Sequence, residues 1–414
     1  MRLLYIAPSS IVPPVSGNRQ MLLGFLRWIS TKATCDVALV YDQPAELTAL
    51  ESTLRGEIPN LHRIRAFPKP AGMARAAARI TAAGCGLHPA MGNYDSAGLK
   101  RWLKTEAIAA DYDLVHFDMF HMAPYRKYVG TLPTFLCASD AYSMAAASAR
   151  ETAPNFGGAV QASVGAWAMR AIERKYYKTF TAVGTVARRD ATLLSQAHPE
   201  INAVVIRLPL PDEIERDTPR AFAPANQCAG ILCAVNVAHP SIANEVTRFL
   251  DRYLPTIRHQ VPGTQMTILG RAPSEKNKQR WQRAGVTCLD YVPSYVSLLK
   301  ADWVFVFPSM CGSGLQTRVQ QAMAMGLPVV SSPEGMSGLE ATHNLHGFSC
   351  TVADEWIGTV RALLLSSDLR VTIGMAAAAH IRQHFSEAKA GAHLLNIYQG
   401  LIGYETPRTV RKEV

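Results

Sequence analysis

Short apolar runs alternate with amphipathic segments along most of the chain. A continuous apolar run is typical of a parallel strand that is covered on both faces, whereas apolar residues at helical spacing predict a helix. In the first half, strands are predicted at residues 2–8, 35–41, 111–120, 134–139 and 181–187, and helices at 21–32 and 166–180. Strand, helix and strand in this order indicate βαβ units and one parallel sheet.

A second alternating series begins after a stretch without periodicity. Residues 208–228 are rich in proline and charge, so we interpret them as an interdomain linker. Beyond the linker, strands are predicted at 229–237, 264–270, 286–292 and 303–309, and helices at 242–260, 274–285, 295–302 and 386–404. The chain therefore reads as an N-terminal domain at 1–207, a second α/β domain at 229–385, and a final helix and tail at 386–414.

The stretch that carries most chemistry is WVFVFPSMCGSGLQTRVQQAMAMGLPVVSSPEGMSGLE, residues 303–340. A strand ends at a glycine-rich loop and a helix follows at once. Glycines let the backbone approach a ligand closely, and the start of a helix offers unpaired N–H groups and the positive end of its dipole. This arrangement suits a diphosphate, and Arg318 in the first turn adds a cation. An ordinary tight loop without a ligand is the alternative.

The segment GSGLQTRVQQAMAMGLPVVSS resembles the nucleotide-sugar site of GT-B glycosyltransferases, in particular the retaining glycosyltransferase family 4 and its bacterial polysaccharide members. The similarity extends to most of the chain and is weaker between about residues 45 and 200. It implies an α/β GT-B fold: two Rossmann-like αβα domains facing across a cleft, with the C-terminal helix crossing back to the N-terminal domain. It also implies metal-independent sugar transfer from a nucleoside-diphosphate sugar, with no further cofactor and no metal site.

The resemblance implies specific contacts with the donor. Arg318 and Arg271, at the end of a strand, would stabilise the departing diphosphate, and the carbonyl of Gln321 would accept from the ribose. The other residues that we expect at the donor are Gly17, Asn18, Arg19, Tyr291, Val292, Gly312, Ser313, Gly314, Leu315, Gln316, Thr317 and Glu334. The alternatives are that Arg19 and Arg271 are solvated surface arginines and that Glu334 is a solvated loop residue.

Gln321 departs from the family pattern, which has a glutamate at that position. A neutral acceptor makes a weaker hydrogen bond than a carboxylate. Besides weaker donor binding or a changed nucleotide preference, this raises a second hypothesis: a non-catalytic nucleotide-sugar or glycan-binding protein. An epimerase on the same architecture is a third hypothesis, but it needs paired acid and base carboxylates, and the sequence offers no convincing pair.

Polar side chains at strand ends of the first half are candidates for the acceptor side. His116 and Asp118 share one face of a predicted strand, and Asp118 could orient an acceptor hydroxyl or take its proton. A metal site that includes His121, or a core histidine with a capping aspartate, are the alternatives. Asp140 follows the next strand and either points to the cleft or caps a helix.

Charge and composition narrow the partners. The formal net charge of +10 favours anionic ligands, and without a nucleic-acid-binding signature we expect phosphorylated substrates or a membrane surface instead of nucleic acid. The expected acceptor is therefore a glycan or a lipid-linked molecule. The eight scattered cysteines, the lack of a signal-peptide pattern and the lack of a bilayer-length apolar run predict a cytoplasmic protein with reduced thiols. It could contact the inner face of the cytoplasmic membrane.

Overall fold

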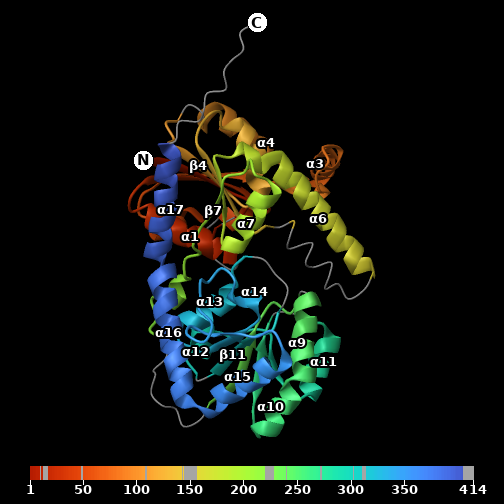
Figure 1. Cartoon of the computed structure of the whole chain (residues 1–414). Coiled ribbons are helices and arrows are strands. Elements are labelled where there is room, and N and C mark those ends of the chain that lie inside the picture. The colour runs from red at the N-terminus through yellow and green to blue at the C-terminus, as the bar shows by residue number, and fades with distance from the viewer. Residues whose placement is uncertain are drawn as a thin grey trace.

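The structure is a computed structural model of the whole chain. It describes residues 1–9, 11–12, 17–47, 50–107, 110–141, 143, 156–219, 228–238, 240–270, 273–301, 303–309 and 314–403, without the side chains of residues 45, 46 and 161. Two parallel sheets, one in each half of the chain, form the centres of two domains stacked one above the other (Figure 1). Helices cover both faces of each sheet, so the predicted GT-B architecture is confirmed.

The N-terminal sheet has the strand order β3-β2-β1-β4-β5-β6-β7. Its strands are β1 Arg2–Ala7, β2 Thr34–Tyr41, β3 Leu61–Pro68, β4 Leu114–Asp118, β5 Thr134–Ser139, β6 Ala182–Thr185 and β7 Ala203–Val205. Its longer helices are α1 Gly17–Ile29, α2 Leu50–Glu57, α3 Gly72–Gly84, α4 Ala97–Trp102, α6 Phe156–Tyr176 and α7 Arg188–Ala197. The order reverses between β1 and β4, and ligands of such sheets bind beyond the strand ends at this reversal.

Short helical segments connect the strands of the N-terminal domain. They are η1 Pro44–Leu47, η2 Pro89–Tyr94, η3 Leu103–Ala107, η4 Phe120–Tyr128 and η5 Tyr177–Thr179. The segment η4 follows β4 directly, so it begins at the end of the sheet where a ligand is expected.

The C-terminal sheet has the order β10-β9-β8-β11-β12-β13, with the reversal between β8 and β11. Its strands are β8 Gly230–Ala234, β9 Met266–Leu269, β10 Thr287–Leu289, β11 Trp303–Phe307, β12 Val329–Ser331 and β13 Phe348–Ser349. The helices are α9 Pro240–Arg252, α10 Leu254–Gln260, α11 Glu275–Arg283, α12 Tyr295–Leu299, α13 Thr317–Ala324, α14 Pro333–Met336, α15 Ala353–Leu365, α16 Ser367–Phe385 and α17 Glu387–Ile402. The short helix α8 Asp212–Glu215 lies within the predicted linker.

The structure differs from the expected elements at one helix and one strand. The single helix predicted at 242–260 is two helices, α9 and α10, because Pro255 lies in the first turn of α10 and cannot donate the hydrogen bond that would continue α9. The edge strand β3 was not predicted, because its sequence LHRIRAFP is largely exposed and carries two arginines in place of an apolar run.

The helix α17 crosses back to the N-terminal domain and lies along α1 (Figure 1). Gly391 permits the approach, since a Cβ atom there would lie 2.6 Å from the Trp28 ring. His393 Nε2 lies 2.9 Å from the carbonyl oxygen of Val205, and the Tyr398 hydroxyl contacts His116 Nδ1. The predicted crossover helix is thus confirmed, and it ties the two domains together.

No single helix in the part of the chain that the structure describes is long and apolar enough to cross a membrane. One pair, Ala353–Leu365 with Ser367–Ile402, reaches that length and composition only across a bend of 105°. The seven cysteines of the described ranges are all free thiols.

Candidate functional site

Two helix N-termini, one from each domain, meet at the cleft between the sheets. A Cβ atom on Gly17, the first residue of α1, would lie 3.6 Å from Thr317 Cγ2, at the start of α13. A cavity of about 660 Å³ opens beside this contact, and a second of about 270 Å³ adjoins it, and both are lined by Gly17, Gln316 and Thr317. Because helix N-termini carry positive partial charge, the junction of the two cavities favours an anionic ligand.

The start of α13 follows from its sequence. Val319, Ala322 and Met323 recur at helical spacing and are fully buried, which fixes the helix against its sheet. Gln316 at the N-cap has extended backbone angles, and its side chain makes no capping hydrogen bond within the described residues. The first N–H groups of a helix have no intrahelical partner, so this N-terminus offers donors to a bound diphosphate.

Gly314, at the end of the glycine-rich turn, lies in close contact with the N-terminal domain. Its φ of +69° is unfavourable for other residues, and a Cβ atom there would lie 1.7 Å from Asp140 Oδ1. Its N–H donates to Asp190 Oδ2 at 2.7 Å in a buried hydrogen bond. The turn therefore faces the gap between the domains, and a carboxylate occupies the position where this amide would meet an anionic ligand.

Asp140 and Asp190 form a pair of acidic groups at this contact. Burial, with the charge of Asp190 in addition, raises the pKa of Asp140 to about 7. Burial also raises the pKa of Asp190, although the N–H groups of Gly314 and Ala141 act in the opposite direction. Asp140 follows β5 and lines the smaller cavity, as one of the two alternatives expected. Asp190 was missed, but an acidic residue in the first turn after β6 is a signal that sequence reasoning could have used.

Arg318 projects from the first turn of α13 into the larger cavity. Its guanidinium carbon lies 4.2 Å from the ring centroid of Tyr295, a cation–π contact. Its Nη1 donates to Gln321 Oε1 at 3.3 Å. Tyr295, which the sequence analysis did not single out, thus holds the cation that we expect to contact the diphosphate.

The two neighbouring glutamines of α13 have different environments. Gln320 is fully buried, and its Nε2 donates to the carbonyl oxygen of Leu208 at 2.9 Å, which joins α13 to the start of the linker. Gln321 is only 3% exposed and accepts from Arg318. Its predicted contact with the donor ribose stays a prediction, while its contact with Arg318 gives it a positioning role.

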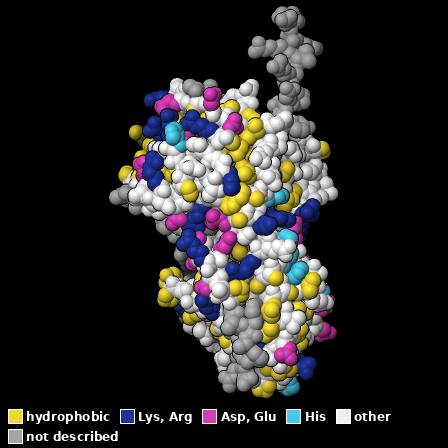
Figure 2. Space-filling model, turned by 90° about the vertical axis from the view of Figure 1, so that its left-hand side faces the viewer, with side chains coloured by type: hydrophobic (Ala, Val, Ile, Leu, Met, Phe, Trp, Pro, Cys, Tyr) yellow, Lys and Arg dark blue, Asp and Glu magenta, His cyan; other side chains and the backbone are white. Residues whose placement is uncertain are grey.

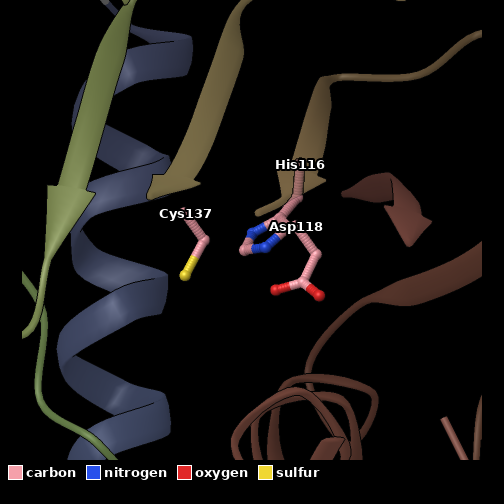
Figure 3. A group of neighbouring side chains, drawn as sticks. All are labelled: His116, Asp118 and Cys137. Carbon is pink, nitrogen blue, oxygen red and sulfur yellow. The ribbon is translucent and has the colours of Figure 1, made fainter. Parts of the chain in front are cut away.

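Asp118 lies with His116 and Cys137 beneath the smaller cavity, on β4 and β5 (Figure 3). Asn18 Nδ2 donates to Asp118 Oδ2 at 2.8 Å, which joins two of the predicted site residues. Burial raises the pKa of Asp118 to about 7 and lowers that of His116 to about 3. All three side chains are buried, so Asp118 reaches a ligand in the cleft only through Asn18 or after a rearrangement.

The same trio offers one nitrogen, one oxygen and one sulfur atom within 4.8 Å of one another, a donor set that could hold a transition metal. Burial raises the pKa of the Cys137 thiol strongly, so the thiolate that such a metal needs is disfavoured here. The expectation of no metal site stays a prediction. His121, the third residue of the metal alternative, stacks on Phe120 instead of joining the trio.

The remaining predicted residues are distributed around the cleft. Tyr291 and Val292 line the larger cavity, and the Tyr291 side chain is 75% exposed. Leu315 lines the smaller cavity, and Arg19 lies in the first turn of α1. Glu334 lies in α14, with one carboxylate oxygen buried and without a hydrogen-bond partner among the described residues. Arg271, Gly312 and Ser313 lie outside the described residues.

Two Rossmann-like domains that face each other across a cleft, with a C-terminal helix returning to the first domain, define the GT-B class. The chain has the GT-B fold, and residues 230–366 match the family described as "Glycosyl transferases group 1". The match covers the whole C-terminal sheet and the site residues from Tyr291 to Glu334. No curated protein sequence matches the chain.

Solved structures similar to this chain share its fold along the whole length. HepE of Anabaena in complex with UDP has a TM-score of 0.64 and 16% identity, and the match covers 97% of this chain and 100% of HepE. A glycosyltransferase of Rickettsia africae has a TM-score of 0.65 and 13% identity, and the match covers 98% of this chain and 99% of that protein. Sucrose-phosphate synthase of Thermosynechococcus elongatus has a TM-score of 0.67 and 14% identity, and the match covers 97% of this chain and 99% of that protein.

Proposed function

We propose that this protein is a retaining, metal-independent glycosyltransferase of family 4 type. It would transfer a sugar from a nucleoside-diphosphate sugar to a glycan or lipid-linked acceptor in bacterial surface polysaccharide biosynthesis. The observation that carries the proposal is the convergence of the α1 and α13 N-termini, with Gly17 against Thr317 and Arg318 beside them. HepE, which shares the fold, is known with UDP and UDP-glucose, so a UDP-sugar is the first donor to test.

The reaction needs stabilisation of the negative charge that the diphosphate gains as its bond to the sugar breaks. The amides at the start of α13 and the Arg318 guanidinium supply positive charge at fixed positions. These groups can take the role that a divalent cation has in other transferases, which supports metal independence. Tyr295 and Gln321 hold Arg318 in place, so little reorganisation is needed when the charge develops.

The acceptor would enter from the N-terminal side of the smaller cavity. Asp140 lines this cavity, and a carboxyl group with a pKa of about 7 can accept a proton from a hydroxyl near neutral pH. The attack would come from the face that the diphosphate leaves, which retains the configuration and requires no carboxylate nucleophile. Asp118 would support Asn18 at the start of α1.

Domain closure is part of the proposed cycle. The Gly314 amide now donates to Asp190, and the donor sugar and diphosphate must share or take over this position. We propose that donor binding exchanges a carboxylate for a phosphate oxygen at the turn, while α17 keeps the domains connected. The enzyme would work in the cytoplasm, with peripheral contact to the inner face of the membrane.

The test is a comparison of Arg318→Ala with Arg248→Ala, an exposed arginine of α9 paired with Glu245 at 3.4 Å. A panel of UDP-, GDP-, ADP- and dTDP-sugars first identifies the donor by thermal shift, because a ligand at 100 times its Kd stabilises by about 2.7 kcal/mol. With that donor, Arg318→Ala should lower kcat/KM for transfer by about 100-fold at an unchanged melting temperature. Unchanged transfer in this variant would refute the mechanism.

A non-catalytic sugar-nucleotide-binding protein is the second candidate, and Gln321 favours it. The two candidates differ in one measurable property, the slow release of free sugar from the donor in the absence of an acceptor. An enzyme should hydrolyse the donor, and Arg318→Ala should stop the hydrolysis. A binding protein should show the thermal shift alone.

A further inference from the structure

Exposed large apolar side chains are concentrated on two helices of the N-terminal domain. Twelve such side chains are exposed among the described residues, and six of them lie on α3 and α6. The six are Met73, Ile80, Phe156, Val160, Val164 and Trp167. Single exposed apolar residues are normal in folded proteins, but a contiguous group of them marks an interaction surface.

The helix α3 packs on η2, where a Cβ atom on Gly92 would lie 2.4 Å from the carbonyl carbon of Ala78, and its other faces are exposed. All its thirteen residues are described, and Ala82 alone is buried. Met73 is 91% exposed and Ile80 is 73% exposed, and their spacing of seven puts them on one face. A helix in water is stabilised mainly by packing of its apolar face, and the face of α3 with Met73 and Ile80 stays uncovered among the described residues.

The outward face of α6 is apolar at its start and basic at its end. Phe156, Val160, Val164 and Trp167 follow one another at intervals of four, four and three residues, and their exposed fractions run from 45% to 85%. The same face continues with Arg170 and Arg174, which are also exposed. The opposite face carries the buried residues of the helix, so the exposed stripe is not a consequence of poor packing.

The exposed charged side chains of α3 and α6 are all basic. The charged residues of α3 are Arg75 and Arg79, and the exposed ones of α6 are Arg170, Arg174 and Lys175. The single acidic residue of the two helices, Glu173, is buried. The face of the molecule that carries α16 and α17 differs, because basic and acidic side chains are intermingled there (Figure 2).

The two helices lie on the same flank of the N-terminal domain (Figure 1). Lys175 Nζ, near the end of α6, donates to the carbonyl oxygen of Cys85, just after α3, at 3.4 Å. A cavity of about 140 Å³ opens between the helices, and its lining includes Ala78 and Tyr176 together with Lys127 and the ion pair of Lys100 with Asp95. The surface thus combines apolar helix faces, a small recess and basic side chains.

We propose that α3 and the outward face of α6 form a docking surface for an anionic lipid bilayer. The apolar side chains would enter the boundary between headgroups and acyl chains, with Trp167 at the headgroup level, while the arginines contact lipid phosphates. Charge complementarity favours this occupant, since the exposed apolar stripe of α6 continues into Arg170, Arg174 and Lys175, and no exposed acidic residue lies on α6. The proposal deepens the proposed function, because a bound bilayer would supply a lipid-linked acceptor to the N-terminal domain.

The test measures binding of the full chain to sedimented vesicles, without donor or acceptor. Vesicles of phosphatidylcholine alone are compared with vesicles that also contain phosphatidylglycerol. Val164→Asp on α6 is compared with Met375→Asp on α16, because the two residues are equally exposed at 54% and 52%. A further variant carries Arg170→Glu and Arg174→Glu. Binding should require phosphatidylglycerol and weaken with salt, and each α6 variant should lose about tenfold in affinity, whereas Met375→Asp should bind normally.

Three outcomes would overturn the proposal: no binding to the anionic vesicles, equal loss in the Met375→Asp control, or a concentration-dependent dimer that Val164→Asp dissociates while vesicle binding is absent. The last result would assign the surface to a second copy of the chain. Thermal stabilisation by the donor is measured on the same proteins. If stabilisation is retained and vesicle binding is absent, docking is wrong and the proposed function stands; the reverse result refutes the function and leaves docking intact.

Discussion

The two domains share one architecture but build their parts of the cleft in different ways. In the C-terminal domain, the donor side comes from one strand, one turn and one helix within residues 303–340, joined by Tyr295 from α12. In the N-terminal domain, it comes from four elements, and the residues Asn18, Asp118, Asp140 and Asp190 are spread over more than 170 positions of the chain. A contiguous site leaves a local sequence signature, whereas a dispersed site leaves single polar residues that only the sheet brings together.

The two sides also differ in charge. The C-terminal side presents a helix N-terminus and Arg318, while the N-terminal side presents carboxyl groups whose pKa values are raised. They meet at the hydrogen bond from Gly314 to Asp190. In the proposed mechanism, the first side holds the donor diphosphate, and the second accepts the proton of the acceptor hydroxyl.

The largest effect is expected where the two sides touch. In Gly314→Ala, the added Cβ atom would collide with Asp140 Oδ1 at a φ of +69°, so the turn or the domain contact must shift. We expect kcat/KM for transfer to fall by about 100-fold or more, measured as release of the nucleoside diphosphate.

Gly56→Ala is the matched control, because a Cβ atom there meets open space in α2. It should leave kcat/KM unchanged. Adding Asp140→Ala to Gly314→Ala should restore part of the donor binding. Full activity of Gly314→Ala would mean that the turn moves freely and that the close contact has no role.

A smaller effect of opposite sign is expected at Asp190. Asp190→Asn keeps an acceptor for the Gly314 amide but removes a negative charge from the position of the diphosphate. The Kd of the nucleoside diphosphate, measured by calorimetry at pH 8, should fall about 3- to 10-fold, since like charges no longer repel. Because the charge of Asp190 helps to raise the pKa of Asp140, the pH profile of transfer should also shift toward acid. Weaker binding would show instead that Asp190 supports the donor site.

Gln321→Glu tests why the C-terminal side departs from its family pattern. A carboxylate would bind Arg318 more strongly than the amide oxygen, which now lies 3.3 Å from Nη1, and would offer a charged acceptor to a ribose hydroxyl. The donor Kd should fall about threefold to tenfold, in line with a gain of roughly 1 kcal/mol from one charge-assisted hydrogen bond. An increase in Kd would mean that a carboxylate draws Arg318 away from the diphosphate.

The smallest effect concerns stability on the N-terminal side. The pKa of Asp118 in the folded protein is about 7, above the ordinary range of a carboxyl group, so the stability provided by its protonated form is lost as the pH rises through 7. Asp118→Asn stays neutral and can still accept from Asn18. It should raise the melting temperature by about 2–4 °C at pH 8, and the difference should vanish as the pH falls toward 4. A difference that does not vary with pH would contradict the shifted pKa.

Sequence patterns predicted the parts of the fold that rest on local physics. Runs such as RLLYIA and WVFVF form β1 and β11. They could be predicted because a parallel strand buried on both faces consists of consecutive apolar residues. The edge strand β3 was not predicted because it is partly exposed to solvent and its two arginines interrupt the apolar run that marks a buried strand. The prediction of α13 worked because the helix, its turn and its cation are consecutive in the chain.

The chain by itself determined the two α/β halves, the final helix and the glycine-rich turn followed by Arg318, because each depends on neighbouring residues, whereas the return of that helix to the N-terminal domain was implied by the family resemblance. Only the tertiary structure decided that Asp190 accepts from Gly314, that Tyr295 holds Arg318, and that Gln320 and Gln321 have unlike environments. These contacts join residues that are 23 to 124 positions apart in the chain. They also give the neighbouring residues Gln320 and Gln321 different partners. Such pairings depend on how the sheets and domains pack. Local periodicity predicts helices and strands but not which distant residues come into contact.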